Sequence, residues 1–261
     1  MMTSTTPESK EGKRKGKIRL WAVLVWLAVW QLVSMWIGQE ILLVSPVTVV
    51  CTVVKLAATA EFWLSIASSM IRIVGGFLLG VILGVVLAGL SAASVRLREF
   101  LLPFIVTVKS IPVASFVILV LIWVSSRNLS VLISFLMVFP VIYTNVLDGI
   151  SQVDRKLLEM ARVFEIPFGR QIRSIYVSQV LPYFRAGCSL ALGLCWKAGV
   201  AAEVIGIPQN SIGEKLYNAK IYLDTSALFA WTLVIICISV LFEKGFLKAI
   251  GYCVRRLEQR G

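Results

Sequence analysis

Hydrophobic residues along the chain gather into long stretches that are separated by shorter polar segments. Six of these stretches hold enough apolar residues for a helix of about 20 residues, the length that crosses a hydrocarbon core of about 30 Å. They cover residues 21–37, 65–89, 101–124, 129–147, 186–206 and 227–250. The pattern therefore predicts an all-α integral membrane protein with about six transmembrane helices.

The first 60 residues divide into a tail, a first span and a surface segment. Residues 1–19 are polar and rich in Lys and Arg, which predicts a basic tail ending at a membrane surface. A cleaved signal peptide is the alternative for stretch 21–37, but the stretch is long for a signal sequence and no Ala-x-Ala-like site follows it. Segment 45–60 is short and starts with Ser45-Pro46, a pair favoured at a helix start. We predict that it lies on the outer membrane surface, and we group it with the first span as residues 20–60.

Basic residues fall mostly on one side of the six predicted spans. Of the 26 Lys and Arg residues, 19 lie on the side of the two termini when the end of the last stretch is counted there. The other side carries Lys55, Arg127, Lys215 and Lys220. Cytoplasmic loops are enriched in Lys and Arg, so we predict a multi-pass protein of the cell (inner) membrane with both termini in the cytoplasm. Residues 251–261 would form a cytoplasmic C-terminal tail.

Composition narrows the class of function. Charged residues make up 15% of the chain, against about 25% in a typical soluble domain, so the chain needs lipid as its solvent. The enrichment of Lys and Arg on the predicted cytoplasmic side explains the net charge of +12, so no nucleic-acid partner is expected. The sequence has no His, and its five Cys form no Cys-x-x-Cys pair, so no metal site is expected. A membrane-embedded enzyme would need clustered acid–base groups, whereas the charges in the spans are scattered, so no catalytic residues are expected.

One long polar loop, residues 148–185, lies on the predicted inner side. Asp154 can cap a short helix, which Pro167 and Gly169 then end. A second short helix with apolar residues on one face is expected to follow. Two such helices would form a docking site for a soluble partner, or would lie on the lipid headgroups as an amphipathic loop. The residues alone leave both interpretations open.

Within this loop, Glu159-Met160-Ala161 is followed four residues later by Glu165. This arrangement resembles the EAA loop of permeases from binding-protein-dependent ABC importers, which have the MetI-like, type I fold. That family has Glu-Ala-Ala at the first three positions and a glycine where Glu165 stands. The resemblance implies a cytoplasmic ATPase-coupling loop formed by Glu159, Met160, Ala161, Phe164, Glu165, Pro167 and Gly169.

Three further segments resemble the nitrate, sulfonate and taurine branch of the same family. They are Ser69-x-x-Arg72 followed by Gly76-Phe77, then Lys109-Ser110-Ile111-Pro112, and finally Trp196 to Glu203 followed by Gly213. Together with the loop they lie in the family's order between about residues 60 and 250. We therefore assign residues 61–250 as the permease transmembrane domain.

The resemblance implies the permease subunit of an ATP-driven importer, working as a homodimer with separate ATPase subunits and an extracytoplasmic solute-binding protein. The chain has no Gly-x-x-x-x-Gly-Lys-Ser/Thr loop, so ATP would be bound by the partner and no cofactor by this chain. The implied solute is small and anionic. A vitamin-precursor importer, the membrane subunit of an energy-coupling-factor importer and a passive channel are the alternatives.

Charged and polar residues inside the spans are candidates for the translocation path, because charge in a membrane usually marks a pathway or a pair. The candidates are Lys109, Ser110, Pro112, Asn145, Lys197 and Glu203. Lys197 and Glu203 lie about 240° apart around a helix and cannot pair with each other on one face. The alternative is that such charges, and Arg72 near the outer surface, only bond between helices and hold the fold.

A stripe of small residues in the second stretch predicts a close helix-packing face. It consists of Gly75, Gly76, Gly80, Gly84 and Gly89.

Overall fold

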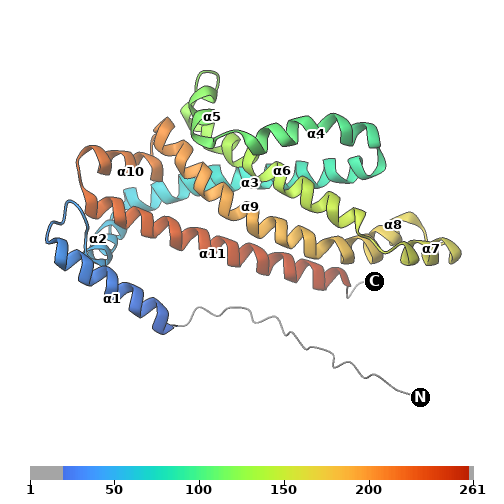
Figure 1. Ribbon diagram of the computed structural model, residues 1–261, viewed down its shortest axis with the longest axis horizontal. Helices are drawn as coiled ribbons and strands as arrows, with labels where there is room; N and C mark the ends of the chain where they lie inside the picture. Colours follow the sequence, from blue (N-terminus) through green and yellow to red (C-terminus); the bar gives the residue numbers. More distant parts are fainter. Residues whose placement is uncertain (1–19, 259–261) are drawn as a thin grey trace, which may run out of the picture.

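The computed structural model describes residues 20–258, and these residues are helical throughout apart from their connections (Figure 1). The predicted basic tail 1–19 lies outside them. The helices are α1 (Leu20–Ile37), α2 (Pro46–Ala57), α3 (Ala60–Ala93), α4 (Val95–Ser110), α5 (Val113–Val120), α6 (Ser126–Ser151), α7 (Arg155–Val163), α8 (Phe168–Gln171), the π-helical turn η1 (Ile172–Tyr176), α9 (Val177–Gly206), α10 (Ile212–Ile221) and α11 (Thr225–Glu258).

The predicted all-α membrane fold is confirmed. Among the described residues, four helices are long and apolar enough to cross a membrane, namely α3, α6, α8 through α9, and α11. A fifth span is formed if the bent pair α4 and α5 is counted as one. The first predicted span is the apolar helix α1, whose 18 residues reach about 27 Å at 1.5 Å per residue. The predicted tail 251–261 is in part the continuation of α11, which ends at Glu258.

The third predicted span is wrong as a single straight helix. Residues 101–124 are divided between α4 and α5, whose axes differ by 106°. Proline has no N–H to donate and restricts the residue before it to extended conformations, and Ile111, directly before Pro112, has φ −74° and ψ 130°. The break therefore follows from Pro112, which caps α5.

The inner loop is shorter than predicted. Helix α6 continues to Ser151, and the expected second short helix is the beginning of one 39-residue helix, Phe168–Gly206. Arg170, Arg173 and Arg185 make this beginning polar, so hydropathy marks only the apolar part of a helix that extends beyond the membrane. Figure 1 shows α7 and α8 at one end of the long helices, and α2 and α10 at the other.

The core lies where α3, α6 and α9 meet, and three glycines set the distance between α3 and α6. A Cβ on Gly76 would lie 2.3 Å from the Val131 carbonyl, and one on Gly80 would lie 2.8 Å from the Val138 side chain. Gly84 meets α6 in the same way. Nothing lies within 4 Å of a Cβ built on Gly75 or Gly89, so the predicted packing stripe is confirmed for three of its five glycines.

Replacing Gly80 by Ala should destabilise the protein by about 1–3 kcal/mol, because the added methyl forces α3 away from α6. The matched control is Gly89→Ala in the same helix, where the methyl enters open space and helix propensity favours Ala. Thermal unfolding in detergent should show a lower Tm for Gly80→Ala and an unchanged or slightly higher Tm for Gly89→Ala. Equal Tm values for both variants would contradict this packing.

Candidate functional site

Helix α7 and the turn after it form an elbow between α6 and α9, which we define as residues 152–168. The Asp154 side chain caps α7 by accepting a 2.9 Å hydrogen bond from the Lys156 N–H, as its sequence position predicts. The Asp154 N–H donates to the Gln179 side chain at 3.1 Å. The start of the elbow is thereby attached to the long helix that follows it.

The inner face of the elbow is packed against the start of that helix. Ala161 is fully buried and forms a small apolar cluster with Val153 and Ile175. The third position of the predicted Glu-Met-Ala motif is therefore a packing position, where a larger side chain would push α7 off α9.

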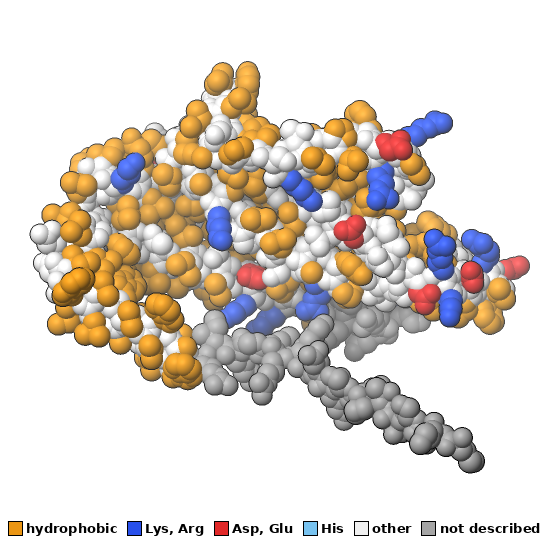
Figure 2. All heavy atoms as spheres, viewed as in Figure 1, with side chains coloured by type: hydrophobic (Ala, Val, Ile, Leu, Met, Phe, Trp, Pro, Cys, Tyr) orange, Lys and Arg blue, Asp and Glu red, His pale blue; other side chains and the backbone are white. Residues whose placement is uncertain are grey.

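The outer face of the elbow is apolar and unusually exposed. Val163, Phe164 and Phe168 are 78%, 73% and 70% exposed, and Met160 is also exposed. Glu159, Pro167 and Gly169 are exposed beside them, and Figure 2 shows Lys, Arg, Asp and Glu side chains gathered at the same end of the molecule. Large apolar side chains among charges are typical of a protein-binding surface.

The turn of the elbow is made at Glu165, the position where the family has glycine. Glu165 has φ 48°, in the left-handed region, and the Ile166 N–H donates to the Ala161 carbonyl at 2.9 Å. This bond closes the Schellman motif that ends many helices, in which glycine is favoured because it has no Cβ. Glu165 thus adopts a backbone conformation that favours glycine.

Among the predicted path residues, Lys109 and Asn145 lie near each other in the fold. The Lys109 Nζ donates to the Thr144 hydroxyl at 3.3 Å, joining α4 to α6. Asn145, next to Thr144, donates to the Val141 carbonyl and packs against Gly187 of α9. Ser110 donates to the carbonyl one turn before it, and Pro112 sits at the break between α4 and α5.

Lys197 lies on the exposed side of α9, farther toward the α10 end. Contacts of Gly199 with Ser134 and of Gly187 with Asn145 set the register of α9 on α6. In this register Lys197 is level with a point on α6 about eight residues from Thr144. At a rise of 1.5 Å per residue, the two lie about 12 Å apart along the helix axis. No hydrogen bond or ion pair joins Lys197 to another described residue.

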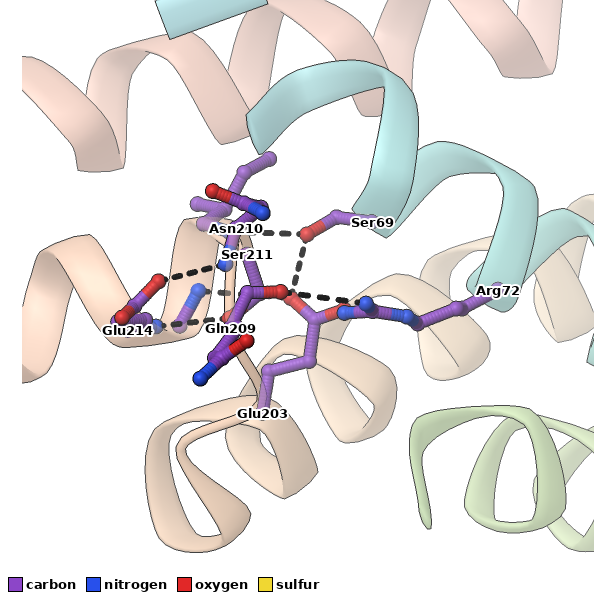
Figure 3. A network of polar contacts seen from close by, with 9 residues as sticks. Ser69, Arg72, Glu203, Gln209, Asn210, Ser211 and Glu214 are labelled. Carbon is purple, nitrogen blue, oxygen red and sulfur yellow. Dashed lines mark hydrogen bonds and ion pairs between the residues drawn. The ribbon is translucent and has the colours of Figure 1, made fainter. Parts of the chain in front are cut away.

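Glu203 lies apart from these residues, buried where α9 meets α3 and α10 (Figure 3). Its Oε2 accepts a 2.6 Å hydrogen bond from the Ser69 hydroxyl and a 3.4 Å bond from the Gly213 N–H. Its Oε1 faces the Arg72 guanidinium at 3.7 Å. Arg72 therefore pairs between helices, as the alternative interpretation expected, and Ser69 is a partner that charge alone does not reveal.

A comparison with known families gives the class of the protein. The family described as "Binding-protein-dependent transport system inner membrane component" matches residues 76–244. The chain belongs to this family. It is the permease component of a binding-protein-dependent ABC importer, a multi-pass inner membrane transport subunit that works with an ATPase and a solute-binding protein.

Curated relatives of this permease are named for three kinds of solute. It is 31% identical to SsuC of Bacillus subtilis (strain 168), named for aliphatic sulfonates transport, over 78% of this chain and 74% of SsuC. It is 28% identical to the nitrate import permease protein NrtB of Synechococcus elongatus, over 75% of this chain and 73% of NrtB. The taurine transport system permease protein TauC of Escherichia coli (strain K12) is 25% identical, over 71% of this chain and 68% of TauC.

The geometry explains two of the motifs that this permease shares with its branch. The Ser69-x-x-Arg72 segment places both polar side chains against Glu203, while Gly76, one turn later, packs against α6. Gly213 is required because a Cβ there would lie 2.3 Å from the Cβ of Glu203. Two motifs far apart in the sequence thus form one contact.

Replacing Glu165 by Gly should stabilise the elbow by about 1 kcal/mol, because glycine adopts positive φ without the penalty of a Cβ. Amide hydrogen exchange of residues 164–166 should slow by about fivefold, the equivalent of that free energy. Glu165→Ala removes the same charge but keeps the Cβ, and it should not slow exchange. Equal slowing in both variants would assign the effect to charge and contradict the backbone argument.

Proposed function

We propose that this permease carries a small anionic solute of the nitrate or sulfonate class, along a path that includes Lys109 and Lys197, and that the elbow couples this movement to ATP hydrolysis by the partner ATPase. The permease acts as a homodimer with both termini and the elbow in the cytoplasm. The observation that carries the solute class is Lys197, which is exposed in the middle of a membrane helix and has no partner in the part of the chain that the structure describes.

An exposed lysine in a span indicates water or a subunit interface beside it. A lysine at the centre of a lipid-facing helix costs about 2.5–3.5 kcal/mol on insertion scales. The exposed side chains of α3 show what a lipid-facing surface looks like in this chain, because they are entirely apolar from Leu78 to Leu90. On α9, Lys197 lies exposed among Leu190, Leu194 and Ala201, and this one charge distinguishes the face from that of α3, so we assign it to the solute path.

The sign of the charge favours an anion. Neither Lys109 nor Lys197 forms an ion pair with an acidic side chain within the described part of the chain. Charges in a site of low dielectric act over longer distances than in water, so two uncompensated lysines favour anions and disfavour cations. The names of SsuC and NrtB refer to sulfonates and nitrate, which are anions.

A second copy would complete this path. In one chain the lysines of α4 and α9 are both exposed, so no part of residues 20–258 encloses a solute there. Two copies related by a two-fold axis, the commonest symmetry of homodimers, would place two such faces opposite each other and bury them from lipid.

The elbow supports the coupling role. Its exposed Val163, Phe164 and Phe168 lie outside the apolar spans, and the distribution of Lys and Arg predicts the cytoplasm for that end. A partner ATPase would cover these side chains, while the buried Ala161 keeps the elbow attached to α9. Movement of the ATPase would then reach the spans directly.

Glu159→Lys should uncouple ATP hydrolysis from transport, because it reverses a charge on the docking surface without changing the packed face of α7. In proteoliposomes with the ATPase and binding protein, we expect solute uptake per ATP hydrolysed to fall by at least about tenfold, which is 1.4 kcal/mol of coupling. The protein should still reach the membrane. Arg155→Gln, at the start of α7, is the control for a general change of charge, and normal coupled uptake by Glu159→Lys would contradict the proposal.

Lys197→Gln should reduce uptake of labelled ethanesulfonate and nitrate by about tenfold, because it removes roughly 1.4 kcal/mol or more of attraction from the path. Lys197→Arg keeps the charge and should retain most of the uptake. Lys244→Gln, an exposed lysine of α11, is the matched control and should have no effect. Unchanged anion uptake by Lys197→Gln would assign this lysine to the fold and remove the main support for an anionic solute.

A further inference from the structure

The start of α10 is bonded to side chains of two other helices. The first N–H groups of any helix have no partner within the helix. In α10 the Ile212 N–H donates to the Ser69 hydroxyl of α3 at 2.9 Å, and the Gly213 N–H donates to Glu203 of α9 at 3.4 Å. Ser211 caps the next N–H, that of Glu214, at 2.9 Å. Helix α10 is therefore attached to α3 and α9 through its own backbone.

Electrostatics strengthen this attachment. The Glu203 carboxylate lies at the N-terminus of α10, where the helix dipole favours negative charge. Arg72 balances the carboxylate from the other side, and its second nitrogen donates to the Gln209 carbonyl at 3.3 Å, in the link between α9 and α10. Figure 3 shows the Ser69, Arg72 and Glu203 side chains pointing toward one another from α3 and α9, beside the link that contains Gln209. Removing Arg72 would leave a buried, unbalanced charge.

The link between α9 and α10 has a strained backbone, which its surroundings hold in place. Ile207 has φ 47° and Asn210 has φ 54°. A β-branched residue in the left-handed region is an outlier, and such strain persists only where the surroundings impose it. The five-residue link from α9 to α10, residues 207–211, thus has a fixed geometry, and α10 cannot change its angle to α9 without breaking the contacts of Glu203.

The other end of α9 is the elbow. Phe168–Gly206 is one helix, so Glu203 and the packed residue Ile175 belong to the same rod. We propose that Arg72 and Glu203 are positioning residues that fix α10 to this rod, so that a solute-binding protein acting on the outer end moves the elbow beneath it. The proposal rests on the proposed function, because it takes the elbow as the site of ATPase coupling.

The test uses the permease with its ATPase subunits in proteoliposomes, with and without saturating solute-loaded binding protein. Two variants remove the ion pair, Arg72→Gln and Glu203→Gln, and the second keeps acceptors for the Ser69 and Gly213 bonds. We expect the stimulation of ATP hydrolysis by binding protein to fall at least fivefold in both, with basal hydrolysis unchanged. Because the pair acts as one unit, the double variant should lose no more than either single variant.

The ion pair between Lys215 and Glu61 provides the control. It also joins α10 to α3, but it is solvent-exposed, and exposed pairs contribute little. Lys215→Gln should leave stimulation unchanged.

The variants Arg72→Gln and Glu203→Gln could lower the Tm while the binding protein still stimulates ATP hydrolysis normally in the folded protein. That result would show that the pair is only structural and would overturn the proposal. Loss of basal hydrolysis together with stimulation would also overturn it. If Glu159→Lys remains fully coupled, the elbow assignment fails instead, and the two results are distinguishable.

Discussion

Close contact of α3 and α9 with α6 is the interaction on which the rest of the structure depends. Lipid is as apolar as leucine, so helices in a membrane gain little from hydrophobic burial and associate through close van der Waals contact. Gly76, Gly80 and Gly84 let α3 approach one side of α6, and Gly187 and Gly199 let α9 approach another. The elbow, the two lysines Lys109 and Lys197 and the contacts of Glu203 are all attached to these three helices, so their relative positions are set by small residues.

The continuity of α9 connects events on the two sides of the membrane. A helix is stiff along its axis because each turn is bonded to the next, although in α9 Pro182 lacks the N–H for this bond. The departure from regular geometry at η1, residues 172–176, lies between the elbow and the span, and π-helical turns often occur at functional positions. Ile175, which packs against Ala161 of the elbow, lies within this turn and belongs to the same helix as Lys197 and Glu203.

The sequence predicts the membrane fold and the elbow because both depend on residue chemistry that is local. The ends of the spans are less predictable, since hydropathy marks where a helix meets lipid and not where its hydrogen bonds end; α9 and its polar extension show this. Pro112 breaks the third span inside a stretch whose overall hydropathy predicts a single helix. The positive φ of Glu165 cannot be read from a glutamate, although the family's glycine at that position signals it. The role of Ser69 depends on which helix faces it, which is a tertiary property.

The same limit applies to charge. Arg72, Lys109, Lys197 and Glu203 look alike in the sequence, as single charges in apolar stretches, and their contacts separate them. Arg72 and Glu203 balance each other in the interior and add no net charge to any path. Lys109 and Lys197 have no acidic partner among residues 20–258, so their charge is uncompensated and positive. In a medium of low dielectric this charge repels cations as strongly as it attracts anions. Under the proposed function, discrimination against cations would therefore belong to the permease itself, whichever anion its binding protein delivers.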